Sequence, residues 1–112
     1  MAAQGLPVTV VGTYGSDGLA GIPLTSGTDC SGTITLGGTA QALAAANAER
    51  RGLTGQNISA GDLWINEAGG TAAADTAGSY RVTAGSTFSV STSRAVSIVG
   101  ATTGQKFTAT EW

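Results

Sequence analysis

Asp62-Leu-Trp-Ile-Asn66 is the stretch that decides the fold of this chain. In an extended backbone successive side chains point to opposite faces, so Leu63 and Ile65 share one face and Trp64 lies on the other. Aromatic and β-branched residues favour strands, and polar residues bracket the run at both ends. The stretch therefore predicts a β-strand with one buried face.

Similar short runs of alternating apolar and polar residues, separated by glycine-containing turns, continue on both sides of this strand. Seven or eight strands at a spacing of roughly 8–12 residues are typical of an antiparallel sandwich or jelly roll. We therefore predict an all-β domain over residues 32–112, a small jelly-roll-like β-sandwich. The expected strands cover residues 32–36, 40–46, 51–59, 62–66, 80–82, 87–91, 96–98 and 106–110.

Two local details follow from the alternation. Ile34 and Leu36 are expected on one face of the first of these strands. The strands on either side of Ser59-Ala-Gly61 are expected to pair as a β-hairpin, with a possible bulge near Ile58.

Residues 40–51 are ambiguous between strand and helix. Their alanines and leucine favour a helix. Leu43 is the one large apolar residue among them, so a helix would have no face to bury. A strand around Ala40–Ala46, followed by a turn at Asn47–Glu49, is the preferred interpretation, and a helix is the alternative.

Residues 1–31 differ from the remainder of the chain. They contain both prolines and one β-rich run, Pro7-Val-Thr-Val-Val11. A segment with so little to bury by itself is expected to be an extended N-terminal arm with one short strand, lying on another surface. The alternative is a strand that belongs to the sandwich.

The composition describes a single domain with a small core. The chain has 112 residues, of which 41% are hydrophobic and only 11% are charged, and alanine supplies many of the hydrophobic ones. A lightly filled core with few surface charges fits a subunit that completes its burial against neighbours, so we expect a homo-oligomer. The alternative is a marginally stable monomer.

Several classes of function are not expected. The net charge of −2, with five basic residues, provides no electrostatic footprint for nucleic acid. No apolar window is long enough for a membrane helix, and the N-terminus lacks the features of a signal peptide, so synthesis in a cytoplasm is expected. Without histidine, and with Cys30 alone, we expect no enzyme, no cofactor and no disulfide within the chain. Calcium binding by Asp62, Glu67 and Asp75 is chemically possible, but their spacing matches no ligand loop.

Seven residues are candidates for contact with a partner. Arg50 and Arg51 could meet an acidic neighbouring subunit, or else bind local carbonyl groups and carboxylates such as Glu49, Asp62 or Glu67. Trp64 lies opposite Leu63 and Ile65 and is interpreted first as a subunit contact, with core packing and glycan stacking as alternatives. The full set is Val8, Val10, Tyr14, Arg50, Arg51, Trp64 and Trp112.

The middle of the chain resembles a group of small virion-associated proteins of tailed bacteriophages, over roughly residues 32–112. The resemblance rests on Asn47-x-x-Arg50-Arg51-Gly-Leu, Gln56-Asn57-Ile-Ser, Gly61-Asp62-Leu-Trp-Ile-Asn66, Gly69-Gly-Thr-Ala72, Gly78-Ser79-Tyr-Arg-Val, Ala95-Val-Ser-Ile-Val-Gly100 and Gly104-Gln-Lys-Phe107.

This resemblance implies a structural protein of the virion, made in the host bacterial cytoplasm. The leading expectation is a capsid decoration (cement) protein on the capsid surface, trimeric around a lattice symmetry point, that binds the major capsid protein. The alternative is a tail or head fibre or a tail-adaptor component, which could contact host glycan.

Overall fold

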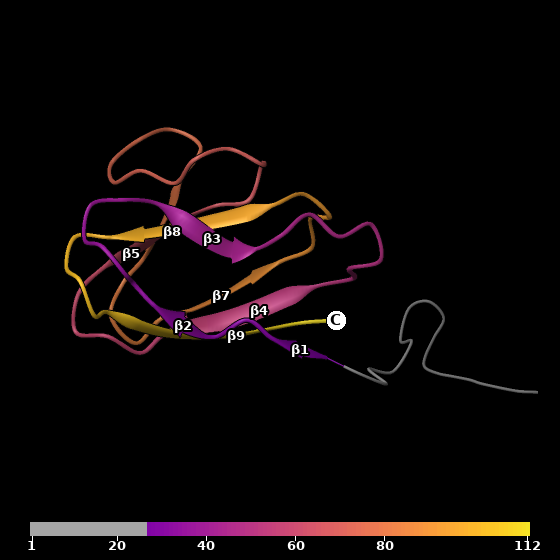
Figure 1. The fold of residues 1–112 in the computed structure, drawn as a ribbon, viewed down its shortest axis with the longest axis horizontal. Coiled ribbons are helices and arrows are strands. Elements are labelled where there is room, and N and C mark those ends of the chain that lie inside the picture. Colours follow the sequence, from indigo (N-terminus) through magenta and orange to yellow (C-terminus); the bar gives the residue numbers. More distant parts are fainter. Residues whose placement is uncertain (1–26) are drawn as a thin grey trace, which may run out of the picture.

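A computed structural model describes residues 27–112, which form a two-layer β-sandwich of nine short strands and no helix (Figure 1). The all-β prediction is therefore confirmed. The strands are β1 (Thr28–Asp29), β2 (Gly32–Thr33), β3 (Gln41–Ala44), β4 (Leu53–Asn57), β5 (Leu63–Asn66), β6 (Tyr80–Val82), β7 (Thr87–Val90), β8 (Val96–Gly100) and β9 (Lys106–Glu111).

The two sheets have the strand order of a jelly roll. One sheet runs β1-β9-β4-β7, with β2 also paired to β9, and the other runs β3-β8-β5-β6. Every pairing is antiparallel, and most neighbours in a sheet are far apart in the sequence. The chain crosses repeatedly between the sheets, which encloses the core between them.

The first edge of the sandwich is one interrupted strand. β1 and β2 both pair with β9, and between them the N–H of Cys30 donates to the carbonyl of Ala109 at 2.8 Å. The sheet therefore begins at Thr28, inside the segment that the sequence assigned to an arm over residues 1–31. The predicted strand at residues 7–11 lies outside the described residues.

The core lies between the sheets and is mainly aliphatic. Leu63 and Ile65 are buried while Trp64 lies on the opposite face, as the alternation predicts. The buried cluster consists of Ile34, Leu43, Ala44, Leu53, Leu63, Ile65, Val82, Val90, Val96, Ile98, Phe107 and Ala109.

Residues 40–51 contain a strand and no helix. In β3, Leu43 and Ala44 are both buried although they are neighbours in sequence. A shift of register against β8 between residues 42 and 44 permits this, because a bulge interrupts the alternation of faces. The preferred interpretation is confirmed, and so is the turn that follows, in which the N–H of Arg50 donates to the carbonyl of Asn47.

Ile34 and Leu36 do not share a face. Ile34 is fully buried, whereas Leu36 is 60% exposed. β2 ends at Thr33, and the chain then turns, with the N–H of Thr39 donating to the carbonyl of Leu36. The prediction was wrong because an alternation argument holds only while the backbone remains extended.

The predicted hairpin between residues 51–59 and 62–66 does not form. β4 pairs with β7 and β9, while β5 lies in the other sheet and pairs with β6 and β8. The buried side chain of Asn57 explains the crossing: its Nδ2 donates to the carbonyls of Gly61 (2.7 Å) and Val82 (2.8 Å). These bonds turn the link away from β4, and Ile58 lies exposed beyond the strand end rather than in a bulge.

Candidate functional site

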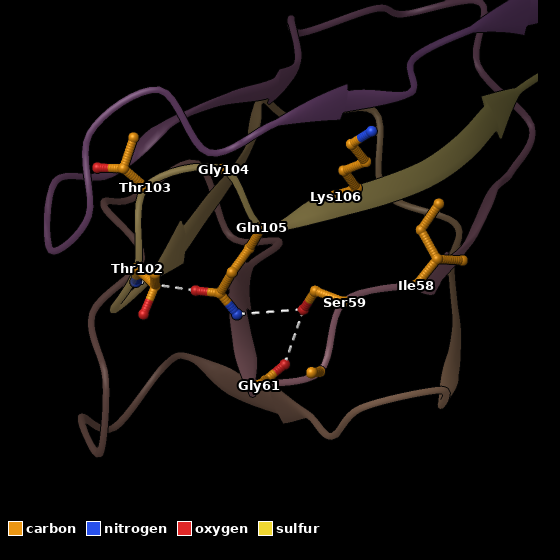
Figure 2. Close-up of a pocket in the computed structure, with 9 residues that line it drawn as sticks. Ile58, Ser59, Gly61, Thr102, Thr103, Gly104, Gln105 and Lys106 are labelled. Carbon is orange, nitrogen blue, oxygen red and sulfur yellow. Dashed lines mark hydrogen bonds between the residues drawn. The ribbon is translucent and has the colours of Figure 1, made fainter.

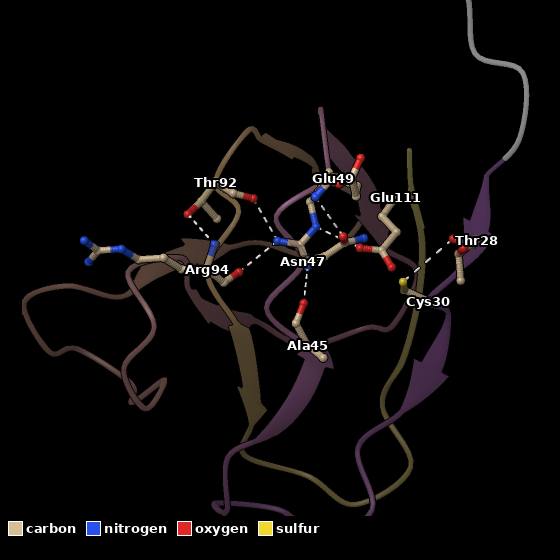
Figure 3. A network of polar contacts seen from close by, with 9 residues as sticks. Thr28, Cys30, Ala45, Asn47, Glu49, Thr92, Arg94 and Glu111 are labelled. Atoms are coloured by element: carbon tan, nitrogen blue, oxygen red, sulfur yellow. Dashed lines mark hydrogen bonds and ion pairs between the residues drawn. The ribbon is translucent and has the colours of Figure 1, made fainter.

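Arg50 is buried and joins the two sheets at one end of the sandwich. Its side chain has 0% exposure. Nε donates to Glu111 Oε1 on β9 at 2.8 Å, and Nη1 donates at 2.8 Å to the carbonyls of Thr92 and Arg94, between β7 and β8. Nη2 donates to the carbonyl of Ala45, just beyond β3. Figure 3 shows these groups converging from both layers.

The expectation that Arg50 contacts a partner is therefore corrected. A guanidinium has five N–H donors and remains charged, so burying it requires acceptors on every side. This one is surrounded by three carbonyl groups and one carboxylate. Its role in the described fold is structural, in line with the alternative of local bonding, although the carboxylate is Glu111 and not Glu49, Asp62 or Glu67.

Arg51 and Trp112 lie together at the same end. Arg51 is exposed, and its N–H and that of Gly52 both donate to the carbonyl oxygen of Trp112. The half-buried Trp112 indole packs over Gly52, where an added Cβ would lie 2.6 Å from the ring. Thr28 of β1 pairs with Glu111 beside them, and Figure 1 shows β1 next to the C-terminus. We call the surface formed by Thr28, Arg51, Gly52 and Trp112 the Trp112 end.

Trp64 lies on the outer face of the second sheet, away from the Trp112 end. Its cross-strand neighbours are Val99 on β8 and Arg81 on β6. The indole is half-buried, and the Arg81 Cζ atom lies 5.7 Å from its ring centroid, within the range of a cation–π contact. An aromatic, an aliphatic and a charged side chain are thus adjacent on one face.

A hollow of about 560 Å³ lies over this face. We call it the Trp64 hollow, and its wall on one side is the alanine-rich loop between β5 and β6, which Figure 1 shows folded back over the outside of the sheet. This volume falls within the range of small-molecule sites. The residues that matter for its chemistry are Asp62, Trp64, Ala72, Asp75, Arg81 and Val99.

The loop wall is fixed by hydrogen bonds along its length. Asn66 Oδ1 accepts from the N–H groups of Ala68 (2.9 Å) and Gly70 (3.2 Å) at its start. In the middle, the Ala72 N–H donates to Ser97 Oγ on β8 at 2.7 Å. The Ala73 N–H then donates to Ser79 Oγ at 3.0 Å. These bonds hold the wall of the hollow against the sheet.

Charged groups line the rim of the Trp64 hollow. Arg81 Nη1 lies 4.0 Å from Asp62 Oδ2, and their side chains are 56% and 44% exposed. An ion pair so long and so exposed contributes little to stability. Asp75, whose φ of 52° is left-handed, lines the hollow from the loop. The Arg81 guanidinium and the carboxylates of Asp62 and Asp75 can therefore form hydrogen bonds with a ligand.

A second hollow of about 550 Å³ adjoins the first and is shown in Figure 2. Its central side chain, Gln105, donates through Nε2 to Ser59 Oγ and to the Asp62 carbonyl at 3.1 Å each. Its Oε1 accepts from the Thr102 N–H at 3.0 Å. Because Gln105 uses its polar atoms inside the protein, it is less suited to hold a ligand here.

A third, shallow hollow of about 460 Å³ lies on the outer face of the first sheet. The side chains around it belong to β4, β7 and β9 and are mostly hydroxylic. They include Thr54, Thr87, Ser89, Thr108 and Thr110. None of these side chains is charged. Of these three hollows, the Trp64 hollow, which has charged side chains at its rim, is therefore the best suited to bind a ligand.

The structure separates the sequence candidates. Arg50, Arg51 and Trp112 meet at one end and Trp64 lies elsewhere, while Val8, Val10 and Tyr14 fall outside the described residues. Among residues 27–112, no three cysteine or carboxylate side chains, Asp62, Glu67 and Asp75 included, gather into a possible metal site. No helix in the same range is long and apolar enough to span a membrane.

Arg81 is a residue of the hollow that was not among the candidates predicted from the sequence. The only available signal was the alternation in Tyr80-Arg-Val82, which places Arg81 opposite Val82 and hence on the outer face. That signal could not show that β6 lies beside β5, because the pairing spans a long loop.

The chain matches no protein-family model, no curated protein and no solved structure.

Proposed function

We propose that this protein is a structural subunit of a tailed-phage virion, and within it a capsid decoration protein that binds the major capsid protein. Two residues of the motifs on which the sequence resemblance rests stabilise the fold. Arg50 joins the two sheets and Asn57 turns the chain between them. A jelly roll hosts many functions, including capsid components, so the fold supports this proposal by analogy only.

The observation that carries the proposal is the meeting of β1 with the Trp112 end. β1 attaches residues 1–26 to the sandwich through the edge of a sheet, immediately beside Arg51 and Trp112. A segment attached at an edge can lie on a neighbouring protein while the sandwich remains folded. Residues 1–26, with Val8, Val10 and Tyr14, would then act with Arg51 and Trp112 as one contact surface.

The work of such a subunit is mechanical. Apolar surface buried against the shell contributes about 25 cal/mol per Å², from which the loss of translational and rotational freedom is subtracted. Repetition over a lattice multiplies a modest contact, and self-association into a trimer around a symmetry point would give each trimer three attachment segments.

Co-sedimentation with expanded capsids that lack the protein tests the proposal. The full chain should bind at a copy number comparable to the lattice sites, and a variant without residues 1–26 should remain folded but lose binding. Arg51→Ala should weaken binding, with Lys106→Ala, an exposed basic residue at the opposite end of β9, as its control. Full binding by the truncated variant would refute the role given to residues 1–26.

A tail or head fibre component, or a tail adaptor, is the second candidate. The Trp64 hollow favours it, because a formed hollow with charged rim residues suits recognition of a ligand better than contact with a flat lattice. Co-sedimentation with tails but not with heads, at a few copies per particle, would select this candidate over the first.

A further inference from the structure

We infer that the Trp64 hollow binds a neutral pyranose sugar, which places its ring on the indole of Trp64 and its hydroxyl groups against Arg81 and Asp62. This goes beyond the virion role and holds wherever the subunit sits.

The indole ring of Trp64 suits the apolar face of a sugar. The face of an indole carries partial negative charge, and the axial C–H groups of a pyranose carry partial positive charge, so the two attract each other. Trp64 is half-buried, so its ring is held in place yet reachable from the hollow. Val99, which is 5% exposed, extends the apolar floor beside it.

The rim of the hollow provides hydrogen-bonding groups for the sugar hydroxyls. Sugar hydroxyls both donate and accept hydrogen bonds, so a sugar site needs acceptors and donors close to the aromatic ring. Asp62 and Asp75 are acceptors, and Arg81 offers a planar set of donors. Arg81 also lies over the Trp64 ring. Because the Arg81 side chain is 56% exposed, this contact and the 4.0 Å pair with Asp62 are both weak, so the guanidinium can move from the ring to the sugar hydroxyls at little cost.

Charge selects among sugars. The hollow is lined by two carboxylates and one guanidinium. An anionic sugar such as a uronic or sialic acid would meet an unfavourable local balance, whereas a neutral one would not. A neutral pyranose is therefore the favoured ligand.

The rigidity of the site also favours a ligand of this size. Ser97 fixes the middle of the loop wall and Asn66 its start, so little ordering is needed when a ligand binds. Small alanine side chains on the wall leave room that larger residues would fill. The volume of about 560 Å³ accommodates one or two sugar rings.

The test uses the full chain carrying Trp112→Phe, which leaves Trp64 as its one tryptophan. The probes are the methyl glycosides of glucose, galactose, mannose and N-acetylglucosamine, with methyl glucuronide as the anionic comparison. We expect at least one neutral glycoside to change the emission of Trp64 saturably, with a Kd of about 1–10 mM, and the glucuronide to bind more weakly.

Amide chemical shifts measured by NMR then locate the binding. The shifts are expected at residues 62–64, 72–75 and 81. The affinity for the glycoside that these shifts report should fall at least tenfold in Trp64→Ala and in Arg81→Ala. Arg51→Ala, a matched change of an exposed arginine at the Trp112 end, should bind as the parent does. Undisturbed spectra of these variants away from the hollow establish that they are folded.

Two results would overturn the inference: no saturable response from any neutral glycoside at concentrations up to roughly 100 mM, or binding that survives both Trp64→Ala and Arg81→Ala. Capsid binding can fail while sugar binding persists, so the two proposals are refuted by different measurements.

Discussion

Arg50 and Glu111 form a buried ion pair, with Nε donating to Oε1 at 2.8 Å, that ties the end of β9 to the crossover between β3 and β4. The same guanidinium also binds carbonyls that belong to the other layer. One side chain therefore holds both sheets together where their strands end.

Replacing Arg50 should strongly destabilise the sandwich. Arg50→Ala leaves Glu111 without its partner and three carbonyl groups without a donor, and breaking a buried pair from one side costs about 3–5 kcal/mol. Arg50→Lys keeps the charge, but an ammonium cannot reach acceptors on all sides, so it should also be destabilised. Urea unfolding followed by circular dichroism measures both.

Arg51→Ala is the matched control, since the neighbouring side chain is exposed. It should change the free energy of unfolding by less than about 0.5 kcal/mol. Equal stability of the Arg50 and Arg51 variants would contradict the structural role given to Arg50.

Local alternation was enough to predict most of the strands. Where a run is extended throughout, as in Leu63-Trp-Ile65, the side-chain faces follow directly from the sequence. A strand was favoured over a helix at residues 40–46 because Leu43 is the one large apolar residue there, and a helix would have had no face to bury. Glycine-containing turns were also expected, and Gly85 and Gly104, which lie in two of them, have positive φ.

Pairings between distant segments could not be predicted in the same way. Asn57 is a polar residue in an apolar pattern, and nothing local shows that its amide would be buried against Val82 and redirect the chain. The four acceptors of Arg50 come from three separate segments, so a buried arginine and an exposed one looked alike. The Trp64 hollow likewise requires β5, β6 and β8 to lie together.

Asn57 should be nearly as sensitive as Arg50. Its Oδ1 accepts from the N–H and the hydroxyl of Ser59, and its Nδ2 donates to two carbonyls. Asn57→Ala leaves several of these groups buried without partners, which should lower the free energy of unfolding by about 2–4 kcal/mol. Asn57→Asp should not restore it, because a carboxylate would face two carbonyl oxygens.

The control for Asn57 is its neighbour in β4. Gln56→Ala removes one exposed bond, from Nε2 to the Gly85 carbonyl, and should cost less than about 1 kcal/mol. If thermal or urea unfolding ranks Gln56→Ala at or below Asn57→Ala, the account of the crossing between sheets is wrong.

Gly52 should control the position of the Trp112 ring. A methyl group at Gly52 would lie 2.6 Å from the indole, so Gly52→Ala must displace the ring toward solvent. In a Trp64→Phe background, the emission of Trp112 should shift to longer wavelength. Gly61→Ala, whose added methyl meets only the end of the Gln105 side chain, should leave this emission unchanged, and an unshifted Gly52→Ala spectrum would contradict the packing described here.

Cys30 should be a slow nucleophile in the folded protein. Burial, and next the negative charge of Glu111, raise the pKa of its thiol above the ordinary value of 9.0. The thiolate is the reactive form, so at about pH 8 a raised pKa means less thiolate and slower alkylation by iodoacetamide.

Cys30 is the only cysteine in the chain, so the rate of alkylation reports on this site alone. The rate should rise with pH to a midpoint above 9.0, and unfolding the same chain in urea should accelerate the reaction at about pH 8. Equal rates for the folded and unfolded chains would show that the edge formed by β1, β2 and β9 does not shield this side chain.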